Sequence, residues 1–142
     1  MLSRLTIKDF ILIEQLEVTF APGFTTITGE TGAGKSIFVG ALSMLLGKRG
    51  ESTLIRQGAN RSIIEASFTD LPSELPRLLE DLDFPVDNSE CILRREIAAT
   101  GRSRAFINDT PASLANLSQV ASLLIDSHSQ HRNLLLSDSN SQ

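Results

Sequence analysis

The first 28 residues carry the hydrophobic pattern of three β-strands. A first set of apolar residues leads through Leu12 and Ile13 into a second set that alternates with polar residues, which predicts two strands joined by a short turn. Their apolar positions are Leu2, Leu5, Ile7 and Phe10, then Leu16, Val18 and Phe20. After a turn at Pro22 and Gly23, the β-branched run 24–28 predicts a short buried strand that stops at Gly29.

A helix is expected directly after this glycine-rich segment. From Lys35 onward the apolar residues recur at helical spacing, and Gly47 stands where a left-handed C-terminal cap would lie. The apolar positions are Ile37, Phe38, Ala41, Leu42, Met44 and Leu45. The chain therefore changes from strand to helix across a loop that begins at Gly29.

The second half predicts further strands around a polar excursion. Residues 62–68 have the pattern of a strand, and the acidic stretch 70–88 carries leucines spaced for one short amphipathic helix. Residues 91–97 and 104–108 predict a strand pair joined around Gly101. We then expect a helix that begins at Pro111, capped by Asp109 or Thr110, and a final short strand over 123–126.

Composition narrows the class of protein. The 142 residues are 41% apolar, and no apolar run approaches the roughly 18 residues of a membrane-spanning helix. Charged residues interrupt the N-terminal apolar positions, so no signal peptide is expected and a cytoplasmic location without membrane contact is predicted. The single cysteine, Cys91, excludes an intrachain disulfide and lies in an apolar stretch typical of a buried thiol.

Charge limits any contact with nucleic acid to a local patch. The chain has 13 Lys plus Arg against 17 Asp plus Glu, whereas domains that bind nucleic acid over a broad surface are usually basic. The basic concentration lies at Arg94, Arg95, Arg102 and Arg104. Such charges near strand ends usually form a solvated face, which is the alternative interpretation of this cluster.

One motif carries specific chemistry. The segment fits G-x-x-x-x-G-K-S/T without a mismatch: Gly29, Glu30, Thr31, Gly32, Ala33, Gly34, Lys35 and Ser36. Glycines let successive N–H groups converge on phosphate oxygens, Lys35 supplies a cation for the β- and γ-phosphates, and Ser36 offers a hydroxyl to magnesium. The alternative is a glycine-rich turn with an exposed lysine, but this motif should arise by chance in under roughly one in a hundred chains of this length. We therefore predict binding of ATP with Mg²⁺.

The chain resembles the N-terminal part of the RecN family of bacterial DNA-repair ATPases, which are related to SMC proteins. The resemblance spans nearly the whole chain and is carried by segments 28–36, 46–49, 55–58, 92–97 with 101–104, and 126–131. It implies an α/β P-loop NTPase fold of the ABC/SMC head type, with a mixed sheet, an antiparallel β-subdomain, and only the N-terminal half of the head. It also implies a role in recombinational repair of DNA double-strand breaks, at the nucleoid.

The resemblance also implies roles for residues outside the P-loop. Gln130 matches the Q-loop glutamine, which reaches magnesium and the attacking water, and Arg49 matches an arginine that approaches the phosphates in SMC heads. A solvated arginine near a helix C-terminus explains Arg49 equally well. His128 and His131 flank Gln130 without a third ligand cluster, so a metal site there is not favoured. The chain departs from the family pattern at Ser127 and Ser129.

Two parts of an ABC-type ATPase are missing from the sequence. It has no Leu-Ser-Gly-Gly-type signature and no apolar strand ending in Asp-Glu. In the resembled family these follow a long coiled coil, so residues 1–136 would be the N-terminal segment of a head and 137–142 a polar tail leading toward that coil. The implied partners are the C-terminal half of the same head, a second copy joined through the heads, and DNA, and hydrolysis by this chain alone is not expected.

Two alternatives stay open at the level of sequence. The run 123–126 ends in Asp126 and can be interpreted as the Walker B strand of a complete small NTPase or kinase. The other alternative is a nucleotide-gated DNA-binding clamp without catalysis, which would share the P-loop but show little turnover.

Overall fold

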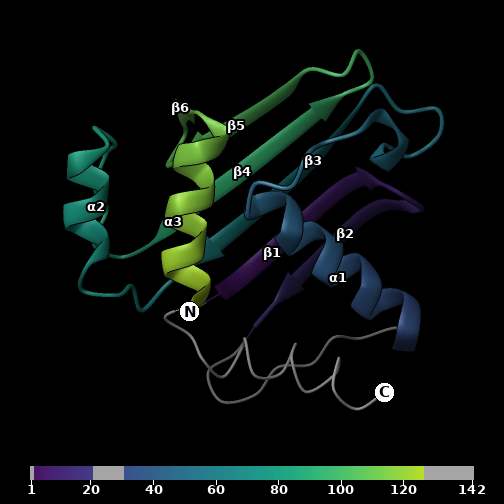
Figure 1. The fold of residues 1–142 in the computed structure, drawn as a ribbon. Helices are drawn as coiled ribbons and strands as arrows, with labels where there is room; N and C mark the ends of the chain where they lie inside the picture. The colour runs from purple at the N-terminus through teal and green to yellow at the C-terminus, as the bar shows by residue number, and fades with distance from the viewer. Residues whose placement is uncertain (1, 21–30, 127–142) are drawn as a thin grey trace.

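The described part of the chain forms one antiparallel sheet with helices on one face (Figure 1). The computed structural model describes residues 2–20 and 31–126, with backbone alone for 31–36, 52 and 126. The strand order is β2-β1-β3-β4-β5-β6. The elements are β1 (Leu2–Phe10), β2 (Ile13–Thr19), α1 (Thr31–Leu45), the 3-10 turn η1 (Ser52–Leu54), β3 (Arg61–Phe68), α2 (Leu75–Asp81), β4 (Cys91–Ala98), β5 (Ser103–Ile107), β6 (Thr110–Ala112) and α3 (Leu114–Asp126).

Strand register brings the apolar residues onto the face that α1 and α3 cover. One row of paired, buried residues crosses five strands in the order Val18, Leu5, Ala66, Leu93 and Ile107. Because side chains alternate between the two faces of a strand, residues two apart continue this apolar face. Burial of this row against the helices forms the core and fixes the register.

The helices complete the core with residues at helical spacing. From α1 these are Phe38, Ala41, Leu42, Met44 and Leu45, and from α3 they are Leu117, Val120, Ala121 and Leu124. The short helix α2 lies beside α3 and buries Leu75 and Leu79 (Figure 1). Each helix in the described ranges is too short or too polar to cross a bilayer.

No described helix covers the opposite face of the sheet, where charged and apolar residues are mixed. Its central row runs from Thr6 through Glu65 and Arg94 to Phe106. The Arg94 guanidinium lies over the Phe106 ring, 5.1 Å from its centroid, and also pairs with Glu96. A cation, a carboxylate and an aromatic ring therefore lie in contact at the middle of this surface.

Most of the predicted elements are confirmed. The two early strands, the helix before Gly47, the strand 62–68, the short helix within 70–88 and the strand pair around Gly101 are all present. Gly101 has a φ of +94°, in the left-handed region that suits glycine in a tight turn. The predicted strand 24–28 and the tail 137–142 lie outside the described residues.

The predicted helix start at Pro111 is wrong. Pro111 belongs to β6 and pairs with Phe106, while Asn108 and Asp109 form a two-residue turn with φ of +49° and +64°. Two positive φ values suit the tight hairpin turns that asparagine and aspartate tolerate. Ser113 caps the helix instead, because its Oγ accepts the Asn116 N–H at 3.0 Å.

The predicted final strand over 123–126 is also wrong. Helix α3 continues through Asp126, and its buried residues keep the helical spacing to Leu124. A short apolar run fits a strand or a buried helical turn equally well, and here the preceding helix extends through it. Asp126 therefore does not end a strand, which removes the structural premise of a Walker B aspartate in a complete small NTPase.

Candidate nucleotide-binding site

The P-loop motif coincides with the start of the longest described helix. Helix α1 begins at Thr31, so the backbone of residues 31–36 forms its first turns, while Gly29 and Glu30 lie outside the described residues. The first N–H groups of a helix have no partner within it, and they favour an anion together with the helix dipole. No acidic residue stands in the first turn of α1 to oppose a phosphate.

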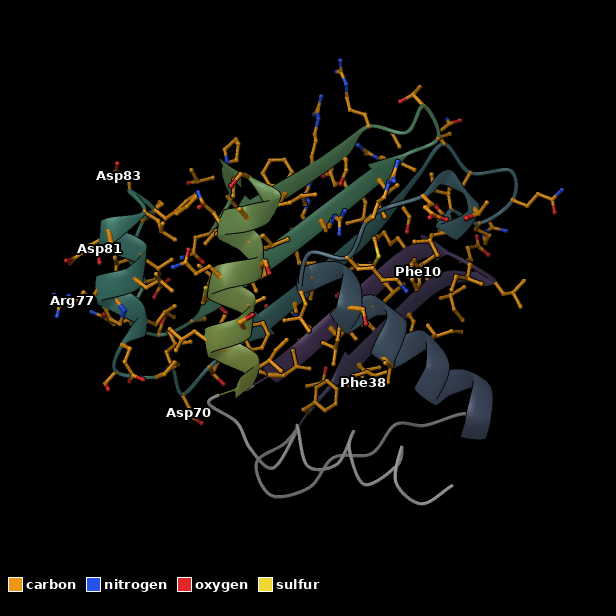
Figure 2. All side chains as sticks on the ribbon, viewed as in Figure 1. Phe10, Phe38, Asp70, Arg77, Asp81 and Asp83 are labelled. Carbon is orange, nitrogen blue, oxygen red and sulfur yellow. The ribbon has the colours of Figure 1, made fainter. Side chains whose placement is uncertain are left out.

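The middle of α1 is held by aromatic residues of the first hairpin. A Cβ built on Gly40 would lie 3.7 Å from the Phe10 ring, an ordinary contact distance, so α1 packs closely over the end of β1. The Phe38 ring, labelled on α1 in Figure 2, packs against the Phe20 ring. Their centroids lie 5.9 Å apart and their planes are tilted by 56°. These contacts set where the helix that carries the motif lies on the sheet.

The chain that follows α1 returns to the end of β1. The Ile11 N–H donates to the Leu54 carbonyl at 2.7 Å, and the Arg56 N–H donates to the Asp9 carbonyl at 2.8 Å. The Arg56 Nε also donates to Asp9 Oδ1 at 3.0 Å. The turn between β1 and β2 is therefore held by residues of the segment that follows α1.

Gly47 ends α1 as predicted. Gly47 has a φ of +98°. The Gly47 N–H donates to the Met44 carbonyl at 3.3 Å, and the Lys48 N–H donates to the Ser43 carbonyl at 3.1 Å. This pair of bonds is the Schellman arrangement, which satisfies carbonyls at a helix end. A Cβ on Gly47 would lie 3.0 Å from the Ser118 Cβ, so α1 also abuts α3 there.

Arg49 is exposed in the loop beyond the C-terminus of α1. The helix has 15 residues, which corresponds to a length of about 22 Å. Within the described residues, the structure thus places Arg49 at the opposite end of α1 from the P-loop and does not bring the two together. Its approach to phosphate stays a prediction.

The basic concentration predicted at Arg94, Arg95, Arg102 and Arg104 is divided by the sheet. Arg95 points to the helix-covered face and is only 1% exposed, while Arg94 lies on the other face. The Arg95 Nη1 donates to the Met44 carbonyl at 2.8 Å and to the Lys48 carbonyl, and the Arg95 Nε donates to Ser103 Oγ at 3.1 Å. Strand parity with Leu93 and Ile97 is the sequence signal that places Arg95 inside.

The remaining candidates fall at the end of α3 and beyond it. Gln130, His128 and His131 lie outside the described residues, as do Ser127 and Ser129. Within the described ranges, no group of three or more His, Cys, Asp or Glu residues is placed to hold a metal ion. Burial raises the pKa of the Cys91 thiol to about 12, so this confirmed buried cysteine is unsuited to act as a nucleophile.

Comparisons with known proteins agree with this geometry. The chain is 44% identical over 140 residues to the DNA repair protein RecN of Haemophilus influenzae, an alignment that covers 96% of this chain and 25% of the relative. A structure from a study of ATP-driven dimerization and DNA-stimulated activation of SMC ATPases superposes with a TM-score of 0.65 and 26% identity, covering 87% of this chain and 79% of that one.

A second solved structure is the Smc head domain of Pyrococcus furiosus, with an extended coiled coil and bound to the C-terminal domain of ScpA. It superposes with a TM-score of 0.67 and 25% identity, covering 87% of this chain and 33% of that one. The predicted fold class is thereby confirmed as the N-terminal segment of an SMC-type head. The chain spans about a quarter of the length of its RecN relative. A family model described as the RecF/RecN/SMC N-terminal domain matches residues 1–130, and the chain belongs to this family.

Proposed function

We propose that this chain is the ATP-binding N-terminal segment of an SMC-type ATPase head that acts in the repair of DNA double-strand breaks. The observation that carries the proposal is a P-loop motif without mismatch whose residues 31–36 form the start of α1. The named role of the RecN relative in DNA repair and the likeness to SMC ATPases support it. We also propose that this chain acts in the cytoplasm at the nucleoid, which the DNA-repair name of the relative supports.

The P-loop residues divide the work of holding ATP. Backbone N–H groups from Gly32 to Ser36 surround the phosphates, and the Lys35 ammonium balances charge on the β- and γ-oxygens. Ser36 and Gln130 would hold Mg²⁺, which neutralises charge on the phosphates when bound. Gln130 would also orient the attacking water.

The relatives support a head that is completed by other segments. They are about four times as long as this chain, and the SMC neighbour comes from a study of ATP-driven dimerization. We infer that a C-terminal segment of the same protein supplies the signature loop and the Asp-Glu pair. A second copy would then close the site through head-to-head contact.

The direct test is a titration of the chain with fluorescent ATP, with and without magnesium. We expect measurable but weak binding with magnesium, because the P-loop is complete while the rest of the head is absent. Chelation of magnesium should lower the affinity by about tenfold, which corresponds to about 1.4 kcal/mol. Ser36→Ala should remove most of this magnesium dependence. A chain that binds no nucleotide, or binds it equally in both conditions, contradicts the proposed site.

DNA contact is proposed at the end of the sheet where β3 begins and β5 begins. The exposed Arg61, Arg102 and Arg104 come together there, because the Ala99 N–H donates to the Asn60 carbonyl at 2.8 Å and joins the two loops. Arg61 forms an ion pair with Glu96 at 3.8 Å, and Arg94 also pairs with this carboxylate. The balance of charge is positive, which suits phosphodiester groups.

We expect weak, salt-sensitive binding of duplex DNA by the chain. A few phosphate contacts should give a slope of about −2 to −4 when log K is plotted against log salt concentration. Joint Arg102→Ala and Arg104→Ala substitution should reduce both the affinity and the slope, as measured by fluorescence anisotropy. Arg77→Ala is the matched control, since Arg77 projects outward from α2 (Figure 2). A complex that persists at high salt, or that ignores the double substitution, argues against this interface.

A further inference from the structure

The C-terminal end of α1 is held by one buried side chain of the sheet. Arg95 of β4 is 1% exposed, and its Nη1 donates to the carbonyls of Met44 and Lys48, which stand on either side of Gly47. Carbonyls at a helix C-terminus lack partners within the helix and carry the negative end of its dipole. A guanidinium at this place both satisfies and neutralises them, so Arg95 caps α1 from the strand on which the helix packs.

The same guanidinium joins α1 to a second strand. The Arg95 Nε donates to Ser103 Oγ at 3.1 Å, which adds β5 to the linked elements. A Cβ built on Gly50 would lie 3.2 Å from the Arg95 Nη2 and 3.1 Å from the Ile97 side chain, so the chain beyond α1 closes over the guanidinium. A rigid fork of donors suits these diverging acceptors better than the compact ammonium of lysine.

The arginine holds this place at a cost in folding free energy. Its Nη2 is buried without a hydrogen-bond partner, and no carboxylate in the described part of the chain forms an ion pair with it. Burial lowers the pKa of Arg95, because desolvation disfavours the charged form. An apolar side chain of similar volume would avoid both penalties. Stability alone therefore does not account for an arginine here.

The tilt of α1 on the sheet decides where the P-loop backbone lies. The helix packs against β3, β4 and α3, and residues 31–36 form its first turns and move with it (Figure 1). Apolar contacts along its middle are non-directional, whereas the hydrogen bonds from Arg95 fix its far end in direction. A tilt of about 5° around the middle of a helix about 22 Å long moves each end by about 1 Å. Such a shift exceeds the normal range of hydrogen-bond lengths to a phosphate.

We propose that Arg95 is a positioning residue for ATP, which sets the tilt of α1 and thereby the place of the P-loop N–H groups. The inference rests on the proposed nucleotide site at residues 29–36. Arg95 touches no phosphate, because it contacts the opposite end of the 15-residue helix. Its effect on ATP is therefore indirect and can be separated from its effect on stability.

The test begins with Arg95→Met in the 142-residue chain, which removes every hydrogen bond of the guanidinium and keeps an unbranched side chain. We expect the affinity for ATP–Mg, measured by titration with fluorescent ATP, to fall by about threefold to tenfold. Arg95→Lys should recover little of this loss, because an ammonium cannot reach both carbonyls and Ser103 together. Ser103→Ala removes only the bond to β5 and should cause a smaller loss.

A matched control separates positioning from loss of stability. Leu79 is buried on α2, and Leu79→Ala leaves a cavity there. This variant should lower the melting temperature at least as much as Arg95→Met does, yet leave the affinity for ATP–Mg unchanged. Should Arg95→Met fail to fold, Gly50→Ala displaces the guanidinium while keeping the arginine, and it should lower the affinity to a similar extent.

A double-mutant cycle with Ser36→Ala tests whether Arg95 acts through the P-loop. Ser36 stands in the first turns of α1 and Arg95 contacts the other end, and the effects of such distant substitutions normally add. If Arg95 places the P-loop, part of its effect depends on the contact that Ser36 makes. The double variant should therefore lose less affinity than the product of the two single losses.

The outcomes distinguish the inference from the proposed function. If Arg95→Met leaves the affinity unchanged while Lys35→Ala lowers it, the inference fails and the nucleotide site stands. Full additivity with Ser36→Ala also refutes the inference, as does a loss of affinity in Leu79→Ala that equals the loss in Arg95→Met. If Lys35→Ala has no effect, the proposed nucleotide site is wrong, and the inference fails with it.

Discussion

Replacement of Lys35 by alanine is expected to lower the affinity for ATP–Mg by about a hundredfold, or about 2.8 kcal/mol. Lys35 stands in the first turns of α1, where the helix N-terminus and the glycine-rich backbone already favour an anion. Its ammonium would add charge-assisted hydrogen bonds to two phosphates, each worth about 1.5–3 kcal/mol. No other side chain of the motif carries a positive charge that could replace it.

Isothermal titration calorimetry of the wild type and the variant measures this effect. Lys8→Ala is the matched control, because Lys8 is exposed on β1 and should leave the affinity unchanged. A melting curve for each variant shows that the fold is retained. Equal affinity of the wild type and Lys35→Ala would remove the P-loop from the account.

The pattern of alternating residues predicted the layers of the fold well. In β4 the residues Cys91, Leu93 and Ile97 share one parity, and all three are buried beneath the helices. Burial of one face fixes the strand register, so the same parity that predicts a strand also predicts its orientation. The pattern identified the strands, and the structure shows that the same parity marks the face that forms the core.

The errors occurred where local patterns fit two structures. Proline is common at the first position of a helix and is also tolerated in a short edge strand, so Pro111 fits either structure. Asn108 and Asp109 both adopt left-handed backbone, and the tight turn that they form pairs Pro111 with β5 as a strand. The run 123–126 has the composition of a buried strand, yet it continues the buried stripe of α3. The neighbouring turn and the length of the preceding helix, rather than the residue types themselves, separated strand from helix in these two segments.

The candidate site was predictable only as far as it is local. The P-loop lies in one continuous segment, and the start of α1 agrees with it. Arg95 contacts Met44 and Lys48, which lie 51 and 47 residues away, so its hydrogen bonds follow from tertiary packing. Arg95 was predicted to belong to a basic concentration, and the parity that it shares with Leu93 and Ile97 is the signal for its burial, but no local rule predicts that it reaches the end of α1. The separation of Arg49 from the P-loop likewise follows from the length of α1, which lies between them.

The second large effect concerns hydrolysis, which we expect to require more than this chain. Lys35 and Ser36 hold phosphates and magnesium, and Gln130 would align water, but the sequence has no Asp-Glu pair and no signature loop. Removal of one group that stabilises charge in a transition state typically costs about a hundredfold to a thousandfold in rate. Adding the C-terminal segment of the head should therefore raise turnover by at least about a hundredfold.

Substitutions in the completed head should separate binding from catalysis. Gln130→Ala should lower turnover more than nucleotide affinity, because its proposed contacts form when water and the γ-phosphate are aligned. Lys35→Ala should lower both quantities. If Gln130→Ala instead weakened affinity without changing turnover, its assignment to the Q-loop would be wrong. A completed head that binds ATP without any turnover would favour the clamp alternative.

Steady-state phosphate release by the highly purified chain, before and after addition of the complementary C-terminal head segment, tests the central claim most directly. The account predicts release at the background rate from the chain alone and ATPase activity once both segments are present. Robust release by the chain alone that Asp126→Ala abolishes would contradict the account, since it would show a complete small NTPase.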